Sequence, residues 1–553
     1  MFKKNKLHLQ PVLISSVNEL PEELRERLDI SWAGVFYREF FSRLDESPFS
    51  VLYADMPSRP NVPVNVLVGL EYLKAGFGWS DEEMYDAFLY DLQVRYALGY
   101  DEFGRGYFDL RTLYYFRERL SRYMQEQGVN LLDQAFEQVT DQQIAAFQLK
   151  AGLQRMDSTQ VGSNIREMGR LQLLVEVLQR VHRMLNADDQ TYYHEALTPY
   201  LQGSAGQYVY RLRREENAAH IQQIGEFMQR LLSELAAGYG EDPIYRVLER
   251  VFHEHFKLEG DKVATKIGRE LSAASLQSPD DLEATFRRKA GKGYRGYVAN
   301  VTETCDPENT LQLITKVQVA PNHTDDTDLL EQALPHLKQR TNLDTLFTDG
   351  GHSGPGPDVV LENLHVTQIQ TGLRGHNPDH HKLSLSDFAI QLDEEAKPAQ
   401  ITCPQKQQVA LYPGRLNKGL VAYFDPTLCQ ACPFWQAQKC PTVVGKRDGR
   451  HQLYVNWVSA HSSQRRRRRE IQKTEPHNLR AAIEATVRSL KHPFPSGKLP
   501  VRGLFRMTCL MIGSAGMINV RRIQRHLIAI SQSNRSKDSF FASCRPLVNS
   551  SIS

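Results

Sequence analysis

The segment HNLRAAIEATVRSLK, residues 477–491, predicts a short amphipathic helix. Pro476 suits the first helical position, where a missing N–H costs nothing, and Pro493 ends the helix. At about 100° per residue, one arc presents a carboxylate flanked by cations, namely His477, Arg480, Glu484 and Lys491. The adjacent arc is aliphatic and predicts the buried side, namely Leu479, Ile483, Val487 and Leu490.

A carboxylate between cations suits chemistry on phosphodiesters. The carboxylate can bind a divalent metal ion, and the cations can bind phosphate oxygens. Arg480 and Glu484 also have the spacing of an i,i+4 ion pair on an ordinary surface helix. Taken alone, the helix favours the surface ion pair, so the rest of the chain must decide between the two interpretations.

Length and charge point to several domains and a polyanionic partner. The chain has 553 residues, enough for two to four domains, and its 41% hydrophobic and 24% charged content is typical of a soluble globular protein. Residues 441–553 carry 21 Lys and Arg against 5 Asp and Glu, a net charge of +16, which leaves −14 on residues 1–440. A basic segment on an acidic remainder predicts that one part binds a polyanion.

The sequence shows no targeting or membrane segment. The first residues, MFKKNK, are followed by mixed sequence and not by an apolar run. The apolar stretch 504–520 contains Arg506 and is short for a membrane span, so it predicts a buried helix. Seven cysteines, an odd number clustered late in the chain, indicate thiols or metal ligands in a reducing cytoplasm.

Residues 1–130 predict several short helices joined by glycine turns. Ser80 and Glu83 form a capping-box pattern, and Asp109 suits the cap of a third helix. That helix carries Arg117 and Arg119 on its outer side. The pattern is compatible with a helix-turn-helix type of DNA reader, and equally with a helical domain that has a solvated charged face.

The first predicted strand runs from residue 147 and ends at Asp157. A carboxylate at a strand end is a common metal ligand, and it is equally a turn or helix-cap residue. From residue 170 to 268 apolar residues recur at spacings of three and four, which predicts a helical bundle inserted between two strands.

Strand character returns after residue 292. Residues 294–302 and 311–319 predict two antiparallel strands, 326–340 a helix, 345–348 a buried strand and 366–371 the next strand. Asp349 ends the buried strand and precedes two glycines, where the backbone leaves room for a metal ion or phosphate. The alternative is a plain Asp-Gly turn.

A cysteine cluster and an arginine run follow. Cys403, Cys429, Cys432 and Cys440 can supply four thiolates to a structural zinc in a loop-rich insertion, with His451 or His461 as substitutes. The alternative is a set of reduced cysteines in a small core. The run 465–469, which begins with Arg465 and Arg466, is either solvated or in contact with a DNA backbone.

Together these motifs resemble the DDE transposases of bacterial insertion sequences. One branch of that family carries the signature Tyr-x2-Arg-x3-Glu-x6-Lys, and Arg480, Glu484 and Lys491 match it with His477 in place of Tyr. The stretch from Asp349 to His352 resembles the Asp-x-Gly-Tyr motif of that branch, again with His for Tyr. The segment 59–119 resembles the helical domain that precedes the catalytic core, and some members carry a similar cysteine cluster.

The resemblance implies an α/β fold with an RNase H-like core, a mixed five-stranded sheet flanked by helices. The expected helical N-terminal DNA-binding domain spans residues 1–130. The core comprises 131–169, 286–395 and 461–530, interrupted by a helical insertion at 170–285 and a Cys-rich insertion at 396–460. Residues 531–553, rich in Ser and Asn, are expected to be a disordered tail.

The resemblance also implies chemistry and partners. Asp157, Asp349 and Glu484 would hold two Mg²⁺ (or Mn²⁺) ions for hydrolysis and strand transfer on double-stranded DNA, that is, transposon ends and target. The expected DNA contacts come from His477, Arg480, Lys491, Arg465, Arg466, Arg117 and Arg119. A homodimer on DNA is expected, in the bacterial cytoplasm and at the nucleoid when bound.

Three other functions are compatible with the sequence. They are a transposase-derived protein that binds DNA without cutting it, an RNase H-like nuclease or Holliday-junction resolvase, and a zinc-dependent regulator that reads DNA through the cysteine cluster. A metal-dependent cleavage and strand-transfer assay separates the first two from a transposase, and chelation of zinc tests the third.

Overall fold

The computed structural model describes most of the 553 residues. It does not describe 11–14, 55–59, 290, 373–378, 380, 394–396, 415–418, 447–448, 473–478, 495–496 and 544–553. For residues 471–472 and 534–543 it describes the backbone alone.

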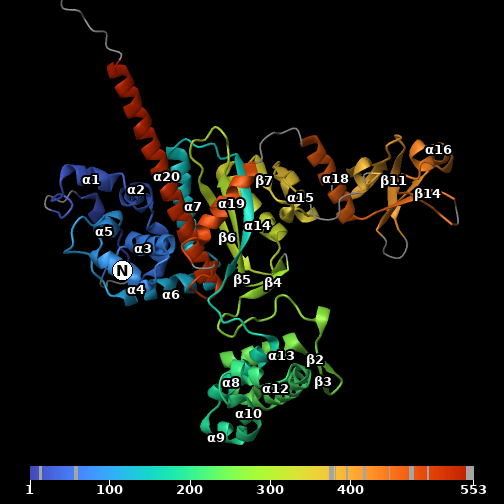
Figure 1. Cartoon of the computed structure of the whole chain (residues 1–553), viewed down its shortest axis with the longest axis horizontal. Helices are drawn as coiled ribbons and strands as arrows, with labels where there is room; N and C mark the ends of the chain where they lie inside the picture. Colours follow the sequence, from blue (N-terminus) through green and yellow to red (C-terminus); the bar gives the residue numbers. More distant parts are fainter. Residues whose placement is uncertain are drawn as a thin grey trace, which may run out of the picture.

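A mixed sheet lies at the centre of the molecule (Figure 1). Its strands are β1 (Leu153–Gly162), β5 (Lys292–Thr304), β6 (Ile314–Pro321), β7 (Thr345–Thr348) and β8 (Thr367–Gln370). In the order β6-β5-β1-β7-β8, the first three strands pair antiparallel and the last three pair parallel. A sixth strand, β4 (Thr285–Lys289), pairs with the first residues of β5. The predicted mixed α/β sheet is confirmed, with β4 as an addition.

Helices cover both faces of this sheet. On one face, α14 (Asp326–Thr341) and α15 (Pro355–Asn363) share an apolar cluster with Met156 of β1 and Leu346 of β7. On the other face, α19 (Ile483–Lys491) follows a 3-10 turn, η9 (Leu479–Ala482), and packs on β1. Ile483, Val487 and Leu490 of the predicted aliphatic arc are buried. Because successive strand residues point to opposite faces, Met156 faces α14 and Asp157 faces α19.

The N-terminal region is helical, as predicted. It contains α1 (Glu22–Asp29), α2 (Trp32–Glu39), α3 (Val64–Phe77), α4 (Asp81–Tyr90), α5 (Leu92–Ala97) and α6 (Leu110–Gln127), and α7 (Leu131–Ala146) leads into the sheet. Ser80 and Glu83 form the reciprocal capping box at the start of α4. The Asp109 side chain caps α6 by accepting from the Arg111 N–H at 2.8 Å.

The last helix, α20 (Leu504–Ser543), packs against α3 and joins this region to the sheet (Figure 1). Glycines allow the close approach: a Cβ on Gly76 would lie 2.3 Å from Met517 Cγ, and one on Gly516 would lie 2.3 Å from Tyr72 Cε1. The predicted buried helix at 504–520 is thus part of a longer one. The tail expected from residue 531 differs from the structure, because α20 continues to Ser543.

The inserted bundle has a core of its own. It comprises α8 (Arg170–Met184), α9 (Ala187–Tyr192), α10 (His194–Leu201), α11 (Ala205–Arg211), α12 (Asn217–Tyr239) and α13 (Pro243–His255). A two-stranded hairpin of β2 (Phe256–Glu259) and β3 (Lys262–Thr265) follows. Both predicted apolar seams are buried, for example at Leu174 and Leu178 of α8 and at Met228 and Leu231 of α12. No helix among the described residues is long and apolar enough to cross a membrane.

The cysteine-bearing region is a second sheet and not a loop-rich insertion. Its order is β13-β14-β12-β11-β10-β9. The strands are β9 (Ala389–Leu392), β10 (Pro398–Thr402), β11 (Gln408–Pro413), β12 (Leu420–Phe424), β13 (Val443–Val444) and β14 (His451–Val455), with the short helices α16 (Pro426–Gln430) and α17 (Pro433–Gln436). The helix α18 (Trp457–Gln472) carries the arginine run and packs on α15.

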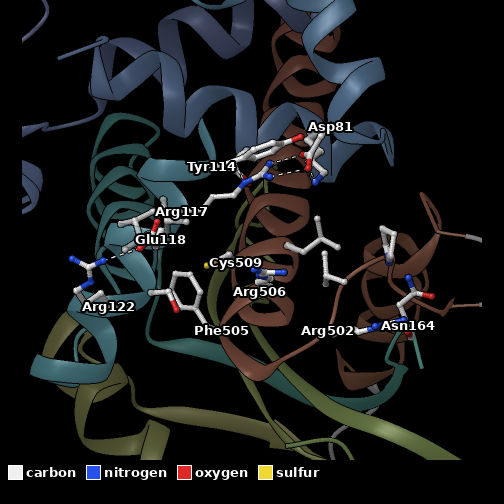
Figure 2. Close-up of a pocket in the computed structure, with 18 of the residues that line it drawn as sticks. Asp81, Tyr114, Arg117, Glu118, Arg122, Asn164, Arg502, Phe505, Arg506 and Cys509 are labelled. Carbon is white, nitrogen blue, oxygen red and sulfur yellow. Dashed lines mark hydrogen bonds and ion pairs between the residues drawn. The ribbon is translucent and has the colours of Figure 1, made fainter. Parts of the chain in front are cut away.

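A partly buried ion-pair cluster joins α3, α4 and α6 beside a pocket of about 720 Å³ (Figure 2). The Arg117 guanidinium donates to Glu71 and to Asp81, with both contacts at 2.6 Å. Lys74 also donates to Asp81 at 2.6 Å. Burial alone would raise the pKa of Asp81, but Arg117 and Lys74 together lower it to about 2. The folded state therefore favours the charged carboxylate.

This cluster makes stability depend on pH. The folded-state pKa of Asp81 is about 2, below the usual 3.8, so its contribution is complete above pH 4 and is lost as the pH falls toward 2. We expect Asp81→Asn to lower the free energy of unfolding by about 1–2 kcal/mol at pH 7, after allowance for partial exposure. Urea unfolding followed by tryptophan fluorescence measures this loss. Glu82→Gln, at the exposed neighbouring carboxylate, is the control, and equal midpoints for the two variants at pH 7 would contradict the expectation.

Candidate active site on β1 and at the end of β7

Two of the predicted acidic residues lie side by side because of strand register. In the parallel pair, Arg155 of β1 is opposite Phe347 of β7. Asp157 and Asp349 each follow two residues later, so they lie level with each other. The predicted strand from residue 147 to Asp157 is wrong in both bounds, because β1 begins at Leu153 and continues to Gly162 along β5, which places Asp157 in the middle of the strand. Burial and the charge of Asp349 raise the pKa of Asp157, while Arg480 opposes this rise. The two carboxylates therefore interact electrostatically across one site.

Asp349 is held in a fixed orientation by the turn that follows it. Its Oδ1 accepts from the Gly351 N–H at 2.8 Å and is 2.8 Å from His352 Nδ1. His352 is fully buried, and its Nε2 lies 3.4 Å from Asn300 Oδ1 on β5. Burial would raise the pKa of Asp349, but His352, the Gly351 N–H and Arg480 hold it well below its usual range. Asp349 is thus a charged, oriented carboxylate.

Arg480 brings Glu484 to the same site. Its Nη2 donates to Asp157 Oδ2 at 3.0 Å, and its Nη1 lies 3.6 Å from Glu484 Oε1. The side chain of Arg480 is 16% exposed and that of Glu484 is 67% exposed. One guanidinium therefore bridges a buried carboxylate on β1 and an exposed one on the first turn of α19. Asp157 and Glu484 thus share Arg480 as a partner, and Asp349 lies close enough for its charge to act on Asp157.

Lys491 adds a second cation on the same side of β1. Its Nζ donates to Thr159 Oγ1 at 2.6 Å, and Thr159 lies two residues beyond Asp157 on the same face of the strand. Burial and the nearby charge of Lys289 lower the pKa of Lys491. Arg480 and Lys491 thus place positive charge along the edge of the acidic site, where an anionic substrate would lie.

The sequence did not single out a fourth carboxylate, Asp326, at the start of α14. Ser158 Oγ donates to Asp326 Oδ1 at 2.8 Å. A Cβ placed on Gly351 would lie 2.8 Å from Asp326 Oδ2 and 2.8 Å from Asp349 Oδ1, so the two carboxylates are neighbours. In the sequence Asp326 reads as one of several acidic residues in a first helical turn, a position that such residues favour for the helix dipole.

A buried ionic network holds α19 against the central sheet. Glu303 of β5 is fully buried and accepts from Arg155 Nε at 2.6 Å, from Arg522 Nη1 at 2.7 Å and from Thr486 Oγ1 at 2.7 Å. Arg155 also donates to the Leu479 carbonyl at 2.8 Å. The network joins β1, β5, η9, α19 and α20. It therefore fixes the position of α19 relative to β1, and with it the positions of Arg480 and Glu484.

The donor chemistry of the site fits a hard divalent cation. Asp157, Asp349 and Glu484 supply carboxylate oxygens, which Mg²⁺ and Mn²⁺ prefer. As placed, no three His, Cys, Asp or Glu side chains in the described part of the chain stand ready to hold a metal ion. Arg480 instead neutralises Asp157 and Glu484, so metal binding would require Glu484 to exchange the guanidinium for the ion.

Two of the arginines predicted to contact DNA have internal partners instead. Arg117 is held by Glu71 and Asp81 in the N-terminal cluster. Arg465 pairs with the buried carboxylate of Asp358, which His461 also contacts at 3.1 Å. The sequence does not reveal these pairings because the partners lie far away along the chain.

The remaining residues predicted to contact DNA are Arg119, Arg466 and His477. Arg119 is exposed, with its guanidinium 5.2 Å from the centre of the Tyr53 ring. Arg466 lies on α18 and is half-buried. His477 lies outside the described residues.

The four predicted zinc ligands line one small cavity. Cys403, Cys429, Cys432 and Cys440 are among the residues that line about 20 Å³ of space. Burial raises the pKa of Cys429 to about 11, and the neighbouring thiols add to this effect. Of the two histidines considered as substitutes, His461 is committed to Asp358, and His451 packs edge-on against Trp435 at 4.2 Å.

Comparison with known proteins adds one finding. Residues 16–119 match the family model described as a transposase domain, DUF772. No curated protein and no solved structure matches the chain. The match covers α1 to α5 and the first part of α6, and it supports a transposase family for this chain.

Proposed function

We propose that this chain is a DDE-type DNA transposase that cuts and joins DNA with Asp157, Asp349 and Glu484. The observation that carries the proposal is that Arg480 pairs with both Asp157 of β1 and Glu484 of α19, while Asp349 follows β7, the parallel neighbour of β1, at the level of Asp157. Carboxylates that converge from distant segments on one edge of a sheet indicate a site, because local folding alone would scatter them.

The strand order supports the same proposal. An antiparallel β6-β5-β1 half followed by parallel β7 and β8 is the arrangement expected of an RNase H-like core. In this arrangement the first acid lies on the central strand and the second at the end of its parallel neighbour. The match of residues 16–119 to a transposase domain supports a transposase over an unrelated nuclease on the same core.

The residues have separable roles in this proposal. Asp157, Asp349 and Glu484 would hold two Mg²⁺ or Mn²⁺ ions, which supply an activated nucleophile and stabilise the leaving oxygen. Arg480, released from the carboxylates, would bind the phosphate beside the scissile bond, and Lys491 the next one along. His352 keeps Asp349 ionised and correctly turned. We further propose that the chain works as a homodimer on paired DNA ends in the bacterial cytoplasm.

A donor plasmid tests the proposed function. The plasmid carries the gene together with its native flanking DNA, and the purified chain is incubated with it, with a target plasmid and with Mg²⁺. We expect nicks at the element ends and joined donor–target products that EDTA abolishes. Cleavage without joining would favour the nuclease alternative, and binding without cleavage would favour the DNA-binding alternative. Either result would overturn the proposal.

We propose in addition that the four cysteines bind a structural zinc ion. The four cysteines line one small cavity, and four thiolates are the donor set of a closed zinc site that leaves no open position for catalysis. Their side chains are not placed to hold a metal ion in the structure, so binding would require them to draw together around it. We expect about one zinc per chain by elemental analysis and loss of most of it in Cys432→Ser. Cys305→Ser, at a buried cysteine outside the cluster, is the matched control. A wild-type protein purified without zinc and unchanged by added zinc would contradict this prediction.

A further inference from the structure

β4 and the first residues of β5 form a hairpin. This hairpin continues the central sheet past Gly162, where β1 ends. Its register pairs Lys289 with Lys292 and Thr285 with Gly296, whereas β1 ends opposite Gly296 at Gly162. Residues 285–296 contain five cations and no acidic residue, namely Arg287, Arg288, Lys289, Lys292 and Arg295. The hairpin is therefore a strongly basic extension of the strand that pairs with β1.

Strand alternation sorts these cations onto two faces. Arg287 and Lys289 alternate with Phe286 and Arg288 along β4, and the cross-strand partner of Lys289 is Lys292. One face therefore carries Arg287, Lys289 and Lys292, with the Lys292 ammonium 5.5 Å from the centre of the Tyr294 ring. We call this set of four residues the basic face.

A contact of Arg287 places the basic face beside the start of α14, at the edge of the candidate active site. Arg287 Nη1 donates to the Thr324 carbonyl at 2.8 Å, two residues before Asp326, whose carboxylate neighbours that of Asp349. The charge of Lys289 reaches Lys491, which donates to Thr159 beside Asp157. Through the register of β5, the basic face lies on the α14 side of the sheet, as Met156 does, and it adds positive charge at the Asp326 edge of the candidate site.

Two lysines of this face have no acidic partner among the described residues. Lys289 and Lys292 are exposed and form no ion pair there, and only Arg287 approaches a carboxylate, that of Asp325 at 3.4 Å. The β2–β3 hairpin differs, because its Lys257 pairs with Glu259 at 3.0 Å and with Glu270 at 2.7 Å. Lysines that lie close together without a nearby carboxylate repel each other. A bound polyanion would neutralise them and remove this repulsion.

We propose that the basic face binds the phosphate backbone of DNA next to the cleavage position, on the Asp326 side of the site. This inference rests on the proposed function only in taking DNA as the substrate. The hairpin guides the flank of the bound DNA over the sheet, and Arg480 and Lys491 bind the phosphates nearer the acids. It contributes affinity that depends on salt and on the length of the DNA, and it makes no contact with the reacting atoms.

A binding experiment without divalent metal tests this proposal. Duplexes that carry the native element end, with and without flanking DNA beyond the cleavage position, are titrated with wild type and with Lys289→Ala/Lys292→Ala. For the longer duplex we expect the double variant to reduce the slope of log K against log salt by about 2, close to one for each lost phosphate contact. Affinity for the shorter duplex changes less than two-fold.

Lys262→Ala, at an exposed lysine of the β2–β3 hairpin, is the matched control and should leave both measurements unchanged. Circular dichroism melts confirm that each variant is folded. An unchanged salt slope and affinity for the longer duplex would overturn the role of the hairpin, even in a protein that cuts DNA. A reduced slope in a protein that never cuts would support the hairpin while refuting the proposed function, so the two failures are distinguishable.

Discussion

Replacing Glu484 by Gln should reduce DNA cleavage by about 10³-fold or more while leaving the affinity for element ends within about two-fold. The amide keeps the size of the side chain and removes the negative charge needed to hold a divalent ion. Because Glu484 is 67% exposed and lies on a helix packed through other residues, the fold should not change. Loss of activity with intact binding therefore reports on chemistry and not on unfolding.

Single-turnover cleavage of the donor plasmid measures this effect, with end binding measured in parallel. Glu249→Gln on α13 is the control, because it removes the charge of an exposed helical glutamate in the separately packed insertion. Asp157→Asn and Asp349→Asn should be as inactive as Glu484→Gln, and combining the three should cost little more, since they act as a unit. Cleavage by Glu484→Gln at the wild-type rate would remove Glu484 from the site.

The second large effect concerns stability. Glu303→Gln should lower the free energy of unfolding by about 3–5 kcal/mol, because it leaves Arg155 and Arg522 buried without their shared counter-charge. Their side chains are only 10% and 16% exposed, so water replaces the carboxylate poorly. Since Thr486 of α19 also donates to Glu303, the variant should loosen the helix that carries Glu484.

Urea unfolding compares this variant with Glu308→Gln. Glu308 lies five residues further along the chain and pairs with Lys150 on the surface, where both side chains are more than half exposed. Surface pairs of this kind contribute about 0–1 kcal/mol, so the control should be nearly neutral. If both variants unfolded at the same urea concentration, the buried network would not stabilise the fold as described.

Much of the central architecture was predictable from local pattern. The strands that became β5, β6, β7 and β8 show apolar alternation or short apolar runs in the sequence. The aliphatic arc of α19 follows from helical spacing, and the Ser80 capping box from its residue types. Asp349 was identifiable because it ends a buried strand and precedes two glycines, and these features are local.

Other features depend on contacts between distant segments, which a single sequence does not display. Arg117 and Arg465 look like free surface cations until Glu71, Asp81 and Asp358 are placed beside them. Asp326 reads as a helix-start residue, and only the packing of α14 sets it beside Ser158 and Asp349.

Two larger elements were missed for a similar reason. The second sheet has short strands of mixed polarity, which obscured its period. The continuation of α20 past residue 531 has a polar composition that resembles a tail.

The most direct test is anomalous diffraction from crystals of the chain bound to an element end in the presence of Mn²⁺. We expect anomalous peaks between Asp157 and Asp349, with Glu484 turned away from Arg480 to contact the metal. The same peaks should be absent in Glu484→Gln or reduced to one. A map with no peak at these carboxylates, or with Glu484 still paired with Arg480 beside bound DNA and Mn²⁺, would contradict a metal-dependent transposase site.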